Sequence, residues 1–230
     1  MQSAELQILA GGGIAGPLRE IAAQFERVSG HTLVLRFGTT PELIKLATTG
    51  GPFDLGVVPR EVFRDAAARA RFAPDPTTDV ARVGLGVAVR SGAPRPDIGT
   101  SEALKQALLE AKSVATIPAS AAGAHFLRIC EGLGISEAMK AKTRVQPAPP
   151  QIVEAVARGE AELGVFLINV LMAPGLDVVG PFPAALQQEV IFTAAVAANA
   201  RNAQAAQVFI SYLKTPAAIA VLKARGMDRG

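Results

Sequence analysis

Strand-length apolar runs alternate with stretches of helical spacing along almost the whole chain, and this alternation limits the folds that it can adopt. It implies mostly parallel sheets covered by helices on both faces, an α/β architecture whose ligands gather at the carboxyl ends of the strands. Alternating or wholly apolar runs predict strands at Glu5–Ala10, Thr32–Phe37, Asp54–Val58, Arg82–Val89, Ser113–Ile117, Thr143–Gln146, Glu162–Ile168, Asp177–Val179 and Glu189–Ala198.

Helical patterns fill most of the gaps between these strands. In the first gap, Pro17 suits the first residue of a helix, an apolar stripe runs from Leu18 to Val28, and Gly30 is a typical stop. The same spacing predicts further helices at Pro41–Thr49, Ser101–Glu110, Ala122–Gly132, Gln151–Arg158, Ala203–Leu213 and Pro216–Arg225.

Two features predict that the chain forms two lobes. A proline-rich polar stretch, Pro74–Asp79, precedes a long strand, and a second long apolar run, Val190–Ala198, can carry the chain back. We expect lobe I to comprise residues 1–81 and 195–230 and lobe II residues 82–194, with hinge crossovers near 82–89 and 189–198.

Composition excludes several classes of protein. The chain has 230 residues, of which 50% are hydrophobic and 19% are charged, so disorder is excluded. A membrane-spanning helix needs about 18 consecutive apolar residues, and no such run exists. The net charge of +3 is scattered, and with no Trp and one Tyr there is little surface for stacking bases. The sequence therefore predicts a soluble protein that binds no nucleic acid and is not embedded in a membrane.

Cysteine content and the N-terminus bear on the compartment. Cys130 is the single cysteine and lies in an apolar helical pattern, so it is expected in the core. Met1–Glu5 leads straight into a strand, without the basic and apolar regions of a signal peptide. A cytoplasmic location follows if Met1 is native, and a periplasmic one if Met1 was added to a mature exported chain.

The stretch Gly11–Gly16 reads G-x-G-x-x-G between a predicted strand and a predicted helix. This is the context of a dinucleotide fingerprint, and Arg36 at the end of the next strand leaves an NADP site open. The same turn can hold another anion, because small residues expose backbone N–H groups at a helix N-terminus. A purely structural tight turn is the third interpretation.

Two more turns have the same design. In Phe37–Leu43, Thr40 precedes a proline, so its hydroxyl can cap the helix or point at a ligand. In Pro118–His125, small residues again open a helix. Turns of small residues that begin a helix therefore occur three times, spread over the two predicted lobes.

Most catalytic templates are absent: there is no G-x-S-x-G, no H-E-x-x-H and no P-loop motif, and two histidines are too few for a histidine-rich metal site. His31 follows a turn and is expected to be solvated. His125, in the first turn of a helix, either hydrogen-bonds a ligand or is an ordinary half-buried residue. Asp54 is expected to have a structural role, and the expected surface charges are Lys45, Arg60 and Glu61.

An ordered set of segments resembles one known family. The set comprises Leu6–Gly13, Phe25–Gly30, Leu35–Thr40, Thr49–Leu55, Ala121–Gly123, Val156–Gly164 and Phe209–Pro216. In order and spacing these segments resemble the molybdate-binding-like group of periplasmic solute-binding proteins, which have the class II periplasmic binding protein fold. The resemblance spans nearly the whole chain, although no single segment is specific.

The resemblance implies two α/β lobes that close on an oxyanion held by uncharged donors. It places the first ligand serine of the family on Gly13, the second on Thr40 and a backbone donor on Ala122. Another backbone donor falls near Pro149 and Pro150, which have no N–H. The tyrosine of the family falls on Leu167, where Asn169 is the nearest polar substitute. An oxyanion deprived of these donors loses several kcal/mol, which argues against molybdate.

The sequence thus predicts a solute-binding protein that takes a small anion, such as an organic carboxylate, without cofactor or metal. We expect a monomer whose partner, if it is exported, is the membrane component of an ABC transporter. The rival is an isomerase of unsaturated tricarboxylic acids such as aconitate, with His125 as its base. Molybdate or tungstate binding and an NADP-dependent oxidoreductase are less favoured. The predicted ligand-binding residues are Gly12, Gly13, Thr39, Thr40, Ala122, Gly123, His125, Gln151 and Asn169.

Overall fold

The computed structural model describes residues 3–74 and 77–230. Asp75 and Pro76, inside the predicted linker, and Met1 lie outside the described residues. The chain divides into unit 1, Met1–Arg82 with Ile191–Gly230, and unit 2, Val83–Val190. It passes from one unit to the other inside strands β4 (Thr78–Arg90) and β9 (Glu189–Val196).

The sheet of unit 1 is built around β1 (Glu5–Gly11). It pairs in parallel with β2 (Thr32–Gly38) on one side and β3 (Leu55–Pro59) on the other, and β9 is antiparallel to β3. Gly11 is opposite Gly38 in this register. Because parallel strands run in the same direction, the carboxyl ends of β1, β2 and β3 share one edge of the sheet.

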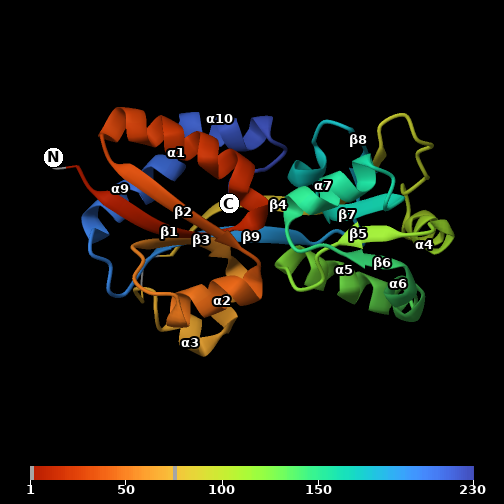
Figure 1. Cartoon of the computed structure of the whole chain (residues 1–230), viewed down its shortest axis with the longest axis horizontal. Coiled ribbons are helices and arrows are strands. Elements are labelled where there is room, and N and C mark those ends of the chain that lie inside the picture. Colours follow the sequence, from red (N-terminus) through yellow and green to blue (C-terminus); the bar gives the residue numbers. More distant parts are fainter. Residues whose placement is uncertain (1–2, 75–76) are drawn as a thin grey trace. The chain divides into compact units, whose positions relative to one another are not determined.

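Helices cover both faces of this sheet (Figure 1). On one face α1 (Ala15–Ser29) packs against α9 (Ala203–Leu213) and α10 (Pro216–Ala224). On the other face lie α2 (Thr40–Thr49) and the short α3 (Ala66–Arg69). Two 3₁₀ turns, η1 (Gly12–Ile14) and η2 (Arg60–Arg64), follow β1 and β3 directly, so both stand at the carboxyl edge.

The sheet of unit 2 contains three short parallel strands. Strand β5 (Val114–Thr116) lies between β6 (Thr143–Val145) and β7 (Leu163–Leu167) and is parallel to both. The long strand β4 is antiparallel to β7 and to β8 (Leu176–Pro181). These pairs and β3–β9 make the sheets less parallel than the sequence predicted, because the strands that carry the chain between the units run antiparallel to their neighbours.

The helices of unit 2 also lie on both faces of its sheet (Figure 1). One face carries α7 (Pro149–Ala157), and the other carries α5 (Ala121–Gly132) and α6 (Ser136–Lys142). Helix α4 (Ser101–Glu110) precedes β5, and α8 (Ile168–Leu171) follows β7. The sequence pattern missed α3, α6 and α8, which are too short to show a helical period.

The prediction that His31 is solvated is wrong. The residue is only 4% exposed, its Nδ1 accepts a hydrogen bond from the backbone N–H of Ala4 at 3.1 Å, and its ring stacks on Phe25 at 5.9 Å. The turn after α1 folds the imidazole back onto the ring one helical turn inside the helix, which a sequence window does not reveal.

Asp54 and Cys130 behave as expected. Asp54 is buried, and its carboxylate accepts hydrogen bonds from the backbone N–H groups of Gln7 and Asn202, each at 2.9 Å. Asp54 therefore links β1 and the start of α9 to the start of β3, which is a structural role. Cys130 is buried in α5, and burial raises the pKa of its thiol to about 12.

No single helix among the described residues is long and apolar enough to cross a membrane, although α9 and α10, bent by 61° at their junction, pass that test as a pair. Both helices pack against α1.

Candidate functional site

The glycine-rich turn that follows β1 lies at the carboxyl edge of the sheet in unit 1. Strand β1 ends at Gly11, where a Cβ atom would lie 2.7 Å from the ring of Phe192 and 3.0 Å from Cδ of Pro59. This glycine therefore serves close packing between strands. The next two residues, Gly12 and Gly13, form η1 with Ile14 and are partly exposed.

Thr39, rather than Thr40, is the N-cap of α2. The carboxylate of Glu42 accepts hydrogen bonds from the backbone N–H of Thr39 at 2.7 Å and from its hydroxyl at 2.8 Å. These two bonds hold the pKa of Glu42 below its ordinary value of 4.5. The expectation that Thr40 can cap this helix is corrected, because the residue before it already has the extended conformation of a cap.

The cap leaves the hydroxyl of Thr40 unused. Thr40 is the first residue of α2, and its Oγ1 is enclosed and has no hydrogen-bond partner in the part of the chain that the structure describes. An enclosed hydroxyl without a partner costs about 1–3 kcal/mol. Such a group at the carboxyl edge of a parallel sheet is typical of a ligand-binding position.

In unit 2, α5 begins at the equivalent edge of the sheet. The Ser120 hydroxyl caps the helix by accepting from the N–H of Gly123 at 3.0 Å and donating to the carbonyl of Ile117 at 2.7 Å. Ala121 and Ala122 occupy the first two helical positions, where backbone N–H groups have no acceptor within the helix. The N-terminus of α5 thus offers two donors and the positive end of a helix dipole to an anion.

Gly123 is required by this geometry. A Cβ atom at this position would lie 1.9 Å from the carbonyl oxygen of Ile117 and 2.7 Å from Cα of Pro118. The helix can start this close to the end of β5 only with glycine here.

Thr116 is a candidate that sequence analysis missed. It is the last residue of β5 and only 1% exposed, and its Oγ1 has no hydrogen-bond partner among the described residues. The available signal was a threonine at the end of an apolar strand, just before a turn of small residues.

The N-terminus of α7 lies at the same edge, because β6, which precedes it, is parallel to β5. Pro149 and Pro150 are its first two residues and have no N–H to donate. The third residue, Gln151, is partly buried, and its Oε1 is enclosed and without a partner among the described residues. Any donor that this helix gives a ligand must therefore come from a side chain.

His125 and Asn169 complete the predicted set in unit 2. His125 is 6% exposed and lies four residues after Ala121, so both are on one face of α5. Asn169 is partly buried in α8, which follows the carboxyl end of β7. The structure thus gathers Gly12, Gly13, Thr39 and Thr40 at the carboxyl edge of unit 1, and Ala122, Gly123, His125, Gln151 and Asn169 at that of unit 2.

Glu61 is not the surface charge that was expected. It belongs to η2 directly after β3, is partly buried, and has an enclosed Oε2. Lys45 and Arg60 are exposed, as predicted, and Arg60 forms an ion pair with Asp79. The sequence alone did not distinguish Glu61 from Arg60, because they are adjacent.

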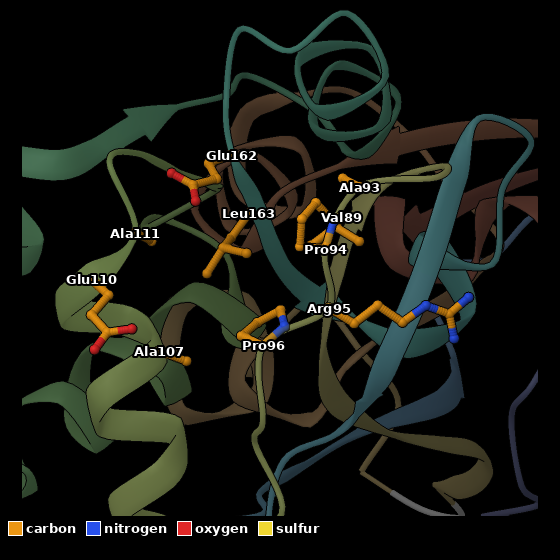
Figure 2. A pocket seen from close by; sticks show the side chains of 10 residues that line it. All are labelled: Val89, Ala93, Pro94, Arg95, Pro96, Ala107, Glu110, Ala111, Glu162 and Leu163. Carbon is orange, nitrogen blue, oxygen red and sulfur yellow. The ribbon is translucent and has the colours of Figure 1, made fainter.

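A separate pocket of about 240 Å³ lies in unit 2 (Figure 2). It includes Leu163, the first residue of β7, and the last turn of α4, so it stands at the amino end of β7. None of the predicted ligand-binding residues lines it. Within the described ranges, no group of three or more His, Cys, Asp or Glu side chains is arranged to hold a metal ion.

Known proteins resemble this chain over nearly its whole length. A Pseudomonas sp. protein named aconitate isomerase is 33% identical, over 96% of this chain and 87% of its own. A molybdate-binding protein of Azotobacter vinelandii is 27% identical, over 98% and 90% of the two chains. The solved structure of the Azotobacter vinelandii periplasmic molybdate-binding protein matches with a TM-score of 0.81 at 19% identity, covering 96% of this chain and 98% of that one.

These matches confirm the molybdate-binding-like resemblance and the two-lobed class II periplasmic binding protein fold. The model of the family described as bacterial extracellular solute-binding protein matches residues 6–228. The chain therefore belongs to the bacterial extracellular solute-binding protein family.

Proposed function

We propose that this protein binds a small organic carboxylate through uncharged donors of the kind found at the carboxyl edge of the sheet in unit 1 and, separately, in unit 2. The observation that carries the proposal is the enclosed Thr40 hydroxyl, which is left without a partner because Thr39 and Glu42 already cap α2. Thr116 and the first N–H groups of α5 provide the corresponding groups in unit 2.

The donor set favours a carboxylate over a tetrahedral oxyanion. A dehydrated oxyanion needs a donor for each oxygen, and each missing hydrogen bond costs on the order of 1–3 kcal/mol. In this chain Pro149 and Pro150 remove two backbone donors from α7, and Leu167 has no hydroxyl to offer. Each carboxylate group has two oxygens where molybdate has four on one centre, so fewer donors have to converge on one point.

In its cellular role the protein delivers this ligand to the membrane component of an ABC transporter. The family of extracellular solute-binding proteins supports this proposal, as does the structural match to the substrate-binding domain of a putative molybdenum ABC transporter from Clostridium difficile, with a TM-score of 0.74. The location that goes with this role is the periplasm.

A thermal-shift panel tests the ligand class. The purified protein is heated with molybdate, sulfate, phosphate, citrate, aconitate or NADPH, and a ligand at 100 times its dissociation constant stabilises the fold by about 2.7 kcal/mol. We expect the carboxylates to raise the midpoint. A shift with molybdate alone would overturn the proposed ligand class, and a shift with NADPH alone would overturn anion transport as well.

A second candidate function is isomerisation of an unsaturated tricarboxylic acid such as aconitate. The relative named aconitate isomerase, at 33% identity, favours it. The reaction needs a base near a proton beside a carboxylate, and the buried His125, on the first turns of α5, is suitable. Interconversion of cis- and trans-aconitate, followed by proton NMR, tests this candidate, and we expect His125→Ala to abolish turnover while binding is largely retained.

A further inference from the structure

We propose that the ligand is a hydroxycarboxylate, whose hydroxyl group donates a hydrogen bond to the side-chain amide of Gln151. The inference rests on the carboxylate binding proposed above and narrows the class of ligand. Its basis is an enclosed acceptor in unit 2, the Oε1 of Gln151, at the same edge of the sheet as the donors of α5.

Two enclosed polar groups lie at the carboxyl edge of the sheet in unit 2. Thr116, the last residue of β5, is 1% exposed, and its carbonyl accepts a hydrogen bond from the backbone N–H of Gln146 at 2.9 Å. This hydrogen bond joins the segment after β6 to the end of β5, and α7 begins shortly afterwards at Pro149 and packs against β5. Gln151, in the first turn of α7, therefore lies in the same part of unit 2 as Thr116.

The packing of α7 keeps the Gln151 side chain partly buried. Ile152 and Val156 face the sheet, since a Cβ atom on Gly164 of β7 would lie 3.5 Å and 3.1 Å from their Cγ2 atoms. Gln151 shares a side of the helix with Ala155, which is 4% exposed. The Oε1 atom is enclosed on this side and has no hydrogen-bond partner in the described part of the chain.

The amide oxygen differs from the other groups of this edge in what it can bind. The N–H groups of Ala121 and Ala122 donate, and the hydroxyl of Thr116 can donate or accept. The Oε1 of Gln151 only accepts, and so does an ionised carboxylate. A carboxylate placed against Oε1 would bring two acceptors together and leave both unsatisfied. The ligand therefore has to bring a donor of its own.

A hydroxyl group suits this position better than an ammonium group. Both α5 and α7 begin at this edge, and the positive ends of their dipoles attract a carboxylate and oppose a cation. Among the described residues, the first turns of these two helices contain no acidic side chain that offsets the repulsion. A neutral hydroxyl can donate to Oε1 while a carboxylate of the same ligand accepts from N–H groups.

Citrate and propane-1,2,3-tricarboxylate test the inference, because they differ only in a hydroxyl group. Each is titrated calorimetrically into the wild-type protein at a pH at which all of its carboxylates are ionised. We expect citrate to bind about tenfold more tightly, the effect of one net hydrogen bond. This comparison uses the wild-type protein and needs no variant to fold.

Gln151→Met tests the residue, because methionine is of similar length and has no amide. The preference for citrate should fall to within about threefold, while the dissociation constant for propane-1,2,3-tricarboxylate changes little. Gln106→Met is the matched control, since Gln106 is exposed on α4 and bonds to Glu110 of the same helix. This variant should keep the full preference for citrate.

The outcomes separate this inference from the proposed function. If the wild type binds the two ligands equally, the hydroxyl preference is wrong and carboxylate binding stands. If Gln151→Met keeps the full preference for citrate, the hydroxyl is recognised elsewhere and the role of Gln151 is wrong. If Gln151→Met weakens both ligands equally, the amide donates to a carboxylate, which contradicts the inference. If the wild type binds neither ligand nor aconitate, the inference fails together with carboxylate binding.

Discussion

The carboxyl edges of the two sheets differ in what they offer a ligand. In unit 2, α5 presents the N–H groups of Ala121 and Ala122, with Thr116 beside it, and its cap is the neutral Ser120. In unit 1, the first turn of α2 is occupied by the carboxylate of Glu42, Glu61 follows β3, and the enclosed hydroxyl of Thr40 is a side-chain donor.

This difference suggests a division of labour. A helix N-terminus capped by a neutral serine keeps its positive dipole end for an anion, whereas one with a glutamate in its first turn has already neutralised part of it. We therefore expect the edge of unit 2 to attract an anion more strongly than the edge of unit 1, where a hydroxyl is the available donor.

The largest effect is expected at Gly123. In Gly123→Ala the new methyl group would lie 1.9 Å from the Ile117 carbonyl oxygen, so the start of α5 must move. We expect the free energy of unfolding to fall by about 3 kcal/mol, the upper range for overpacking, and ligand affinity to be lost. Urea unfolding and calorimetry measure the two effects.

Gly132 provides the matched control at the other end of the same helix. A Cβ there has nothing within 4 Å, so Gly132→Ala should leave affinity unchanged and stabilise the fold by about 0.4–1 kcal/mol. Equal destabilisation by both substitutions would show that α5 is merely intolerant of alanine.

An intermediate effect is expected at Thr40. Thr40→Val keeps the shape of the side chain and removes a hydroxyl that has no partner in the described structure, so stability should be unchanged or increased. Ligand affinity should fall about tenfold, equivalent to about 1.4 kcal/mol. Calorimetric titration with citrate or aconitate checks the affinity.

Thr39→Val should give the reverse pattern. It removes the N-cap of α2 and the hydroxyl that donates to Glu42, so stability should fall by about 1 kcal/mol while affinity stays within about threefold. If Thr39→Val and Thr40→Val weaken binding equally, the separation of cap from ligand group is wrong.

The smallest effect is expected from the acidic cap. The pKa of Glu42 is lowered in the folded protein, so its contribution to stability is complete above the ordinary value of 4.5 and is lost as the pH falls through the folded pKa. Glu42→Gln should therefore be less stable than the wild type at pH 7, and the gap should narrow at pH 3. A gap that widens on acidification would contradict the cap described here.

The sequence predicted the periodic elements well. The pattern predicted α4 and α9 with their observed bounds and gave the starts of β1, β2 and β9. These elements have a buried face with a clear period, which is visible in a short window.

What the sequence left undetermined depends on contacts between distant residues. Thr40 and Thr39 are equally good caps by residue type, and only the backbone of Thr39 decides which of them keeps a hydroxyl for a ligand. Glu61 and Arg60 are adjacent charges, and only the structure shows that Glu61 is partly buried while Arg60 is exposed. His31 was misjudged for the same reason, because Phe25 and Ala4 bury it.

Carboxylate binding is tested most directly by calorimetric titration of the wild-type protein with trans-aconitate and, separately, with molybdate, at one pH and ionic strength. We predict saturable 1:1 binding of the carboxylate and no detectable binding of molybdate. Binding of molybdate without binding of aconitate or citrate would contradict this ligand class, because it would show that the donors which the resemblance expects near Pro149, Pro150 and Leu167 are not needed.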